Sequence, residues 1–69
     1  MNYYGVIYFR GNIPNGKSYC FKSNDKYKVG DIVELPGRKK GFIAGEPVGE
    51  LPEEEKIKFI VGKWIADYE

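Results

Sequence analysis

The stretch from Lys28 to Pro36 constrains the fold most, because it places a turn, a strand and a strand end within a few residues. Gly30 can adopt the positive φ that a sharp turn requires, and Asp31 can bond to the backbone that follows it. Residues 32–35 are rich in β-formers, and Pro36 cannot donate a hydrogen bond to a sheet. We therefore predict a tight turn that leads into a strand, which ends at the proline.

A basic segment follows this strand at once. Gly37 to Gly41 places three cations, Arg38, Lys39 and Lys40, between two glycines. We expect a hairpin whose cationic tip, the 37–41 loop, presents charge to a phosphate. The alternative is a solvated tip whose charges keep a sheet edge from aggregating.

The rest of the chain predicts further strands. The elements that we expect are strands over 3–10, 17–22, 32–35 and 42–48, a loop over 11–16, a helical turn over Pro52 to Lys56 and a last strand from about Ile57 to Ile65. A helical stripe through Ile57, Ile60 and Trp64 leaves a C-terminal helix as the alternative for the last segment. The predicted fold is all-β: a small, five-stranded, strongly bent β-barrel with one short helical turn before the last strand.

Size and composition narrow the possibilities. A chain of 69 residues forms one domain, 1–69, and its aromatic content of 16% predicts a core of a few large rings. Cys20 is the only cysteine and histidine is absent, so we expect no internal disulfide, no metal site and no cofactor. Without a base beside Cys20, we expect no catalytic residue and no enzyme activity. No apolar run suits a membrane span or a secretion signal, so we expect a cytoplasmic protein.

Charge is distributed unevenly along the chain. Up to Gly45 there are eight Lys or Arg against three Asp or Glu, a net charge of +5; from Glu46 onward there are three against seven, a net charge of −4. If the acidic part folds away from the basic hairpin, the protein has one cationic face. If the two parts fold together, their charges neutralise each other.

Several features recur in a characteristic order: Tyr19-Cys20-Phe21, the run from Lys28 to Arg38, a strand that begins at Gly41, and Leu51-Pro52 followed by Ile57 to Ile60. In this order they resemble the N-terminal DNA-binding domain of the primosomal replication helicase family, a small β-barrel-like module that binds DNA at the 3′ ends of strands. The Gly-Asp-x-Val element by itself also occurs in many SH3-like barrels. The ordered set is more specific.

The resemblance implies a nucleotide pocket at Tyr19, Cys20, Gly37 and Lys58. Tyr19 would stack on a base, the Gly37 backbone would approach the ligand, and Lys58 would meet a phosphate. Cys20 stands where the family has an acidic residue that accepts hydrogen bonds from a terminal sugar, and this difference disfavours recognition of a 3′ end. The sequence contains no phosphate-binding motor motif, so we expect a stand-alone binding protein.

The sequence thus predicts a nucleic-acid-binding module that contacts single-stranded or junction DNA. Its predicted binding residues are Tyr19, Gly37, Arg38, Lys39, Lys40 and Lys58. The alternative is a phage-type or mobile-element accessory factor that acts on a host protein through a strand edge or through Glu53, Glu54 and Glu55. The simpler interpretation of those glutamates is a helix-start cluster, and the simpler interpretation of Lys58 is an ordinary surface lysine.

Overall fold

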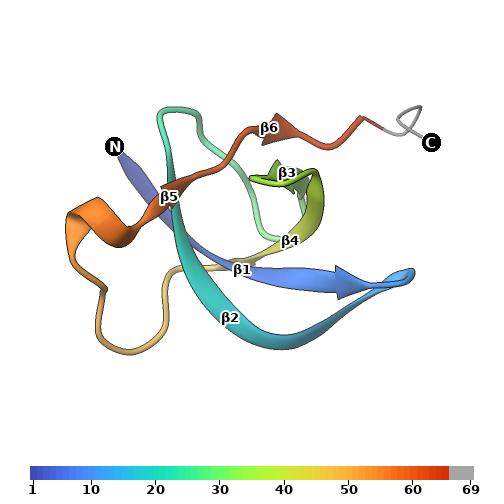
Figure 1. Ribbon diagram of the computed structural model, residues 1–69, viewed down its shortest axis with the longest axis horizontal. Coiled ribbons are helices and arrows are strands. Elements are labelled where there is room, and N and C mark those ends of the chain that lie inside the picture. Colours follow the sequence, from blue (N-terminus) through green and yellow to red (C-terminus); the bar gives the residue numbers. More distant parts are fainter. Residues whose placement is uncertain (66–69) are drawn as a thin grey trace.

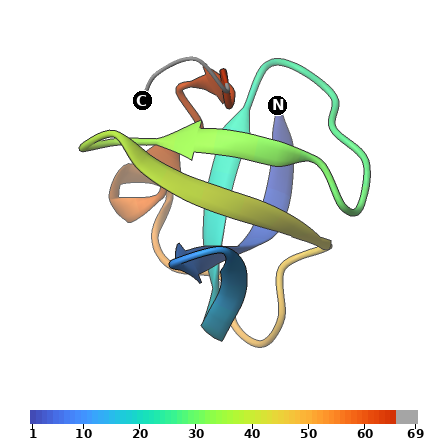
Figure 2. The same ribbon diagram turned by 90° about the vertical axis from the view of Figure 1, so that its right-hand side faces the viewer.

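The computed structural model describes residues 1–65, which form one curled sheet of six strands (Figure 1). The elements are β1 (Asn2–Arg10), β2 (Ile13–Ser23), β3 (Ile32–Leu35), β4 (Lys39–Gly45), the 3-10 helix η1 (Glu54–Lys56), β5 (Lys58–Phe59) and β6 (Gly62–Lys63). The strand order is β5-β2-β1-β4-β3-β6, and all neighbours are antiparallel except β2 and β5. Figure 2 shows how strongly the strands wrap around the interior as a half-barrel.

The prediction of an all-β fold is confirmed, but the prediction of five strands is wrong. We expected one strand over 57–65, but this segment forms two short strands, β5 and β6. They lie on opposite edges of the sheet. Between them, the Ile60 N–H donates to the Lys22 carbonyl of β2 at 2.8 Å, and the Val61 N–H donates to the Glu34 carbonyl of β3 at 2.9 Å. The segment therefore crosses from one edge to the other and ties them together. The helical turn that we expected over Pro52 to Lys56 is a shorter 3-10 turn.

The hairpin of β1 and β2 is longer than predicted. The turn is limited to Gly11 and Asn12, and Gly11 has a φ of 70°, as a two-residue turn with glycine in its first central position requires. The expected loop over 11–16 is wrong, because β2 begins at Ile13. Gly16, with a φ of 107°, lies where the register between the two strands shifts, so the Asn-Gly pair forms a bulge within β2.

The turn before β3 is confirmed. Gly30 has a φ of 96°, and the Asp31 N–H donates to the Lys28 carbonyl at 3.0 Å. The Asp31 carboxylate accepts the Lys28 N–H at 2.8 Å, so the side chain bonds to the backbone that precedes it and not, as predicted, to the backbone that follows. The Gly30 N–H also donates to the Ile43 carbonyl at 2.8 Å, which joins the turn to β4.

The hairpin of β3 and β4 has a shorter tip than the predicted 37–41 loop. Its turn is Pro36 to Arg38, where Gly37 and Arg38 have φ values of 85° and 59°. Lys39 and Lys40 belong to β4 and pair with Leu35 and Glu34. The predicted fourth strand, over 42–48, therefore begins earlier, at Lys39, and ends at Gly45, before Pro47.

The core is built mainly from aliphatic side chains, so the prediction of a ring-based core is wrong. Its buried members are Val6, Phe21, Val33, Leu35, Ile43, Ile57 and Ile60. Three tyrosines, Tyr4, Tyr8 and Tyr27, pack around this cluster while remaining partly exposed. Their hydroxyl groups keep them near water or a polar partner, as where the Tyr4 hydroxyl accepts the Tyr27 N–H at 2.8 Å.

Candidate nucleic-acid interface

Three of the residues singled out by the resemblance lie around one hollow. Strands β2 and β5 run parallel, with Lys58 opposite Phe21, and this pairing brings Lys58 close to Tyr19 and Cys20. The hollow, here called the Tyr19 hollow, has a volume of about 400 Å³ and is lined by Tyr8, Tyr19, Cys20, Phe21, Pro52, Lys56 and Lys58. Small-ligand sites in proteins typically span ~300–1,000 Å³. The chain therefore brings an exposed ring and two amines together at one place.

Tyr19 is positioned by other rings. It is 45% exposed, and its ring meets the Tyr8 ring edge-on with centroids 5.5 Å apart. Tyr8 in turn meets the buried Phe21 ring at 6.1 Å. The Lys17 amine lies 5.7 Å from the Tyr19 ring centroid and adds a third positive charge beside the hollow. The exposed Tyr19 ring is thus connected through the Tyr8 ring to the buried Phe21 ring of the core.

A second hollow shares Tyr8 with the first. This Lys39 hollow has a volume of about 380 Å³ and is lined by Tyr8, Phe9, Lys39 and Lys40. The Lys40 amine lies 4.5 Å from the Phe9 ring centroid and 5.7 Å from that of Trp64. Lys39 is exposed and forms no ion pair with any of residues 1–65. Tyr8 lines both hollows, which therefore form one continuous surface.

The tip of the β3–β4 hairpin lies outside both hollows. Gly37 and Arg38 are exposed in the turn and line neither of them. A Cβ atom on Gly37 would have the flexible Lys39 side chain, at 3.8 Å, as its nearest neighbour. The predicted site residues therefore fall into three groups. Tyr19 and Lys58 line the Tyr19 hollow, Lys39 and Lys40 line the Lys39 hollow, and Gly37 and Arg38 form the turn outside both.

The three glutamates of the alternative site differ in their surroundings. Glu54 accepts a hydrogen bond from the Lys22 amine at 2.7 Å and another from the Tyr3 hydroxyl. Glu53 lies 3.7 Å from the Lys56 amine, and Glu55 is exposed. Because Lys22 is only 9% exposed, Glu54 neutralises a buried cation, whereas Glu53 and Glu55 remain exposed. The Lys22 and Tyr3 hydrogen bonds lower the pKa of Glu54 from its ordinary value.

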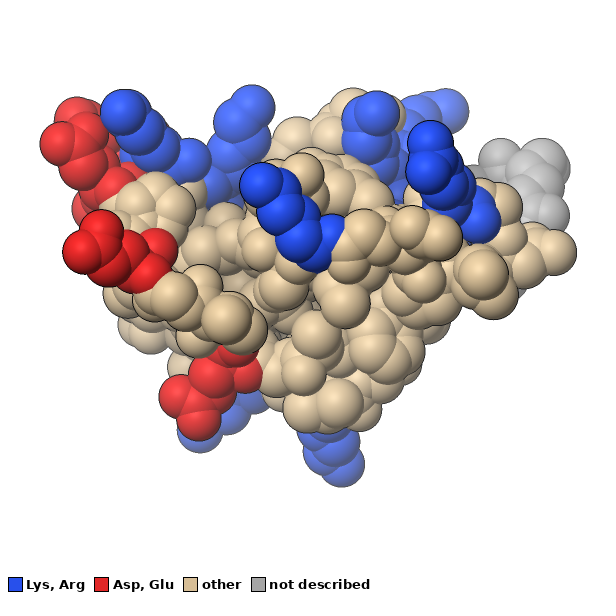
Figure 3. All heavy atoms as spheres, turned by 90° about the horizontal axis from the view of Figure 1, so that it is seen from below, with Lys and Arg blue, Asp and Glu red and all other residues tan. Residues whose placement is uncertain are grey.

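The acidic side chains are clustered, whereas the basic ones are not. In Figure 3 the acidic side chains gather toward the end that carries η1, and Lys and Arg side chains are spread over the whole view. Neither Glu53 nor Glu54 pairs with Lys39 or Lys40; their partners are Lys56 and Lys22. The basic side chains of the Lys39 hollow are therefore not neutralised by these glutamates.

Two groups that line the Tyr19 hollow have raised pKa values. Cys20 is partly buried, and this burial raises the pKa of its thiol, which disfavours the nucleophilic thiolate. Burial also raises the pKa of Tyr8. Within residues 1–65, no group of three or more His, Cys, Asp or Glu side chains is placed to hold a metal ion. What the surface offers is rings and amines.

The sequence did not point to Tyr8, Phe9, Lys17 or Lys56 as site residues. The sequence predicted Tyr8 only as part of the first strand. Its position in the linings of two hollows depends on long-range pairing, because it lies opposite Gly41 of β4 and within the register shift against β2. A β-bulge at Gly16 could have indicated the role of Tyr8, because a bulge changes the direction in which nearby side chains point.

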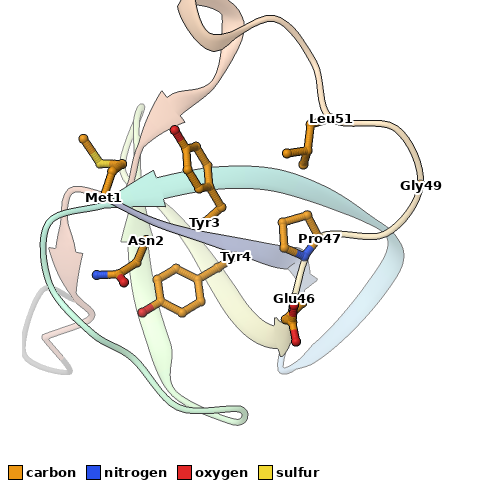
Figure 4. A pocket seen from close by; sticks show the side chains of 8 residues that line it. All are labelled: Met1, Asn2, Tyr3, Tyr4, Glu46, Pro47, Gly49 and Leu51. Atoms are coloured by element: carbon orange, nitrogen blue, oxygen red, sulfur yellow. The ribbon is translucent and has the colours of Figure 1, made fainter.

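A third hollow lies apart from Tyr8 and has a different character (Figure 4). Its lining residues are Met1, Asn2, Tyr3, Tyr4, Glu46, Pro47, Gly49 and Leu51. In Figure 4 the Tyr3, Pro47 and Leu51 side chains face this space from β1 and from the segment after β4. Met1, Val48 and Leu51 are exposed apolar side chains. This surface has no basic residue in its lining and does not suit phosphate.

Comparisons with protein-family models, with curated proteins and with solved structures gave no significant match. In residues 1–65 no helix has the length and apolar character needed to cross a membrane.

Proposed function

We propose that the protein binds single-stranded or junction DNA through the surface made of the Tyr19 and Lys39 hollows, acting as a cytoplasmic binding module and not as an enzyme. The observation that carries this proposal is that Tyr8 joins a hollow containing Tyr19 and Lys58 to one containing Lys39 and Lys40. Rings next to amines are what a flexible strand requires, because bases stack on rings while phosphates meet cations.

The expected affinity is modest. A few lysine contacts give sequence-independent binding that weakens with salt, with dissociation constants on the order of 10⁻⁴–10⁻⁶ M. Lys39 and Lys58 are exposed, and neither forms an ion pair with another residue in 1–65. Lys40 must exchange its contacts with Phe9 and Trp64 to reach a phosphate. We therefore assign the main phosphate contacts to Lys39 and Lys58, with Arg38, Lys40 and the Gly37 backbone at the hairpin as supporting contacts.

The resemblance to the primosomal helicase domain supports the same surface, since Tyr19, Cys20 and Lys58 line one hollow. Gly37 does not take part in this hollow, and Cys20 offers a thiol where that family has an acid. A thiol is a weak hydrogen-bond acceptor. We therefore propose binding along the strand, without selection for a 3′ end.

The test is a titration of fluorescently labelled single-stranded DNA at low and moderate salt. The wild type should bind at low salt and bind more weakly as salt rises. A variant with Arg38, Lys39 and Lys40 changed to Ala should bind more weakly than the wild type at the same salt. Absence of any salt-sensitive binding by the wild type contradicts the proposal. Equal binding by the triple variant removes the hairpin from the site.

A protein-binding role is the second candidate, and the hollow of Figure 4 favours it. Met1 and Leu51 line this hollow and are 59% and 56% exposed, and Val48, between the lining residues Pro47 and Gly49 in the chain, is 82% exposed. Exposed apolar surface of this kind often marks an interaction site. A specific host protein that binds the wild type and is lost when Leu51 is changed to Ser, or when Glu53 and Glu55 are changed to Gln, would support this role. Glu54 is left unchanged because it pairs with Lys22.

A further inference from the structure

We propose that the two hollows, which share Tyr8 in their linings, hold two adjacent bases of one strand, so that a dinucleotide step is the unit that this surface recognises. This inference rests on the proposed function and adds the requirement for consecutive bases. A purely electrostatic surface would accept a phosphate chain with or without bases. The rings around Tyr8 favour recognition of consecutive bases over purely electrostatic binding of the phosphate chain.

Tyr8 is the residue that the two hollows share, and its ring is held in place by other rings. Its ring is partly buried and meets both the Tyr19 ring and the Phe21 ring edge-on, at 5.5 and 6.1 Å, so it is held from the core side. Its neighbour across β4 is Gly41, whose position is packed against Leu35 and Val6, so the strand beside Tyr8 is also fixed. Tyr8 lines both hollows, so a base in either hollow would contact it.

Each hollow supplies a ring and at least one amine. The Tyr19 hollow has the exposed Tyr19 ring with Lys56 and Lys58, and the Lys39 hollow has Phe9 with Lys39 and Lys40. Their volumes, about 400 and about 380 Å³, are similar. Two similar hollows that share Tyr8, each with a ring and a cation, match the repeat of base and phosphate along a single strand.

The most direct test changes the ligand and leaves the protein intact. Labelled DNA strands of equal length and equal phosphate number carry no base, one thymine, two adjacent thymines, or two thymines separated by abasic positions. We expect two adjacent thymines to bind about tenfold or more tightly than one, since one additional stacked base typically contributes this much. The separated pair should bind within about twofold of the single thymine. Equal binding of the abasic and thymine-containing strands, or equal binding of the adjacent and separated pairs, would overturn the inference.

Protein variants provide the matching test. Tyr8→Leu removes the ring but keeps an apolar side chain, and Tyr8→Phe keeps the ring and removes the hydroxyl. We expect the preference for adjacent thymines to disappear in Tyr8→Leu and to remain in Tyr8→Phe. A preference that survives in a folded Tyr8→Leu variant contradicts the role of Tyr8. If Tyr8→Leu fails to fold, the comparison of ligands with the wild type still decides the question.

The two proposals fail in different ways. If a strand with thymine at every position shows no salt-sensitive binding, the nucleic-acid function itself is contradicted. If this strand binds but the abasic strand binds equally well, the function stands and the dinucleotide inference is overturned.

Discussion

The ring of Tyr8 in β1 meets the ring of Tyr19 in β2 at an interplanar angle of 66°, with centroids 5.5 Å apart. Tyr19 lies opposite Val6 in the strand register, and the register shifts between Ile7 and Phe9, so the contact is diagonal and crosses a bulge. The exposed ring of the candidate site is therefore positioned by the sheet itself and not by the basic hairpin. Contacts between such ring pairs contribute about 0.5–1.5 kcal/mol beyond the area that they bury.

We predict that Gly41→Ala destabilises the fold by about 1–3 kcal/mol, because additional volume in a packed core forces its neighbours apart. A Cβ atom at Gly41 would come 2.7 Å from both the Leu35 and the Val6 side chains. Gly62→Ala is the matched control, since a Cβ there meets no atom within 4 Å and Gly62 is not among the glycines with positive φ. Urea denaturation gives the free energy of unfolding of each. A Gly41→Ala variant as stable as Gly62→Ala would show that the core is not packed as described.

We predict that Glu54→Gln lowers stability at neutral pH, and that its effect shrinks at acidic pH. Hydrogen bonds from Lys22 and Tyr3 lower the pKa of Glu54 below its ordinary value of 4.5 in the folded state. A carboxyl group whose pKa is lower in the folded protein stabilises the fold above its unfolded pKa, and this contribution is lost as pH falls through the folded pKa. The difference between wild type and variant should therefore narrow below pH 4.5.

The measurement is chemical denaturation across a pH series, with Glu55→Gln as the control. Glu55 is exposed in the same turn and should show little effect at any pH. A difference between wild type and Glu54→Gln that stays constant from neutral to acidic pH would contradict the assigned pairing with Lys22.

We predict slow alkylation of Cys20 in the folded protein at neutral pH. Burial raises the pKa of its thiol above the ordinary value of 9.0, so less of the reactive thiolate is present. The rate of reaction with iodoacetamide, followed by mass spectrometry, should rise when the protein is unfolded in urea. Because Cys20 lines the Tyr19 hollow, single-stranded DNA should slow the reaction further. A folded protein that reacts as fast as the unfolded chain would contradict this burial.

Local signals predicted the parts of the fold that local chemistry decides. Gly30 and Asp31 form the expected turn because positive φ and a short carboxylate act within a few residues. Asn15 and Gly16 gave a loop signal that the structure overrides, since pairing with β1 continues on both sides of them. The sequence also did not predict that the last segment divides into the two strands β5 and β6. Ile60 and Val61 bond to opposite edges of the sheet, and no periodic pattern reports on two different partners.

For the candidate site, too, some features were predicted from the sequence and others depend on long-range pairing. The resemblance placed Tyr19, Cys20 and Lys58 together, and they line one hollow although β2 and β5 are far apart in sequence. The loop between two glycines suggested a free cationic tip, yet Lys39 and Lys40 lie in β4. Gly41 was expected to end the basic loop and to begin a strand, whereas it lies inside β4, where its buried position next to Leu35 and Val6 shows that it serves close packing. Tyr8 was missed because its role depends on register and not on its neighbours in the chain.

The measurement that tests the central claim most directly is the salt dependence of single-stranded DNA binding by two double variants. Lys39→Ala with Lys58→Ala removes one exposed amine from each hollow, whereas Lys26→Ala with Lys28→Ala removes the same charge before β3, away from both. Each phosphate contact contributes about 0.7 to the slope of log K against log salt. We predict that the first variant loses about 1.4 from the magnitude of this slope, while the second keeps the wild-type slope. Equal slopes for the two variants would contradict the account.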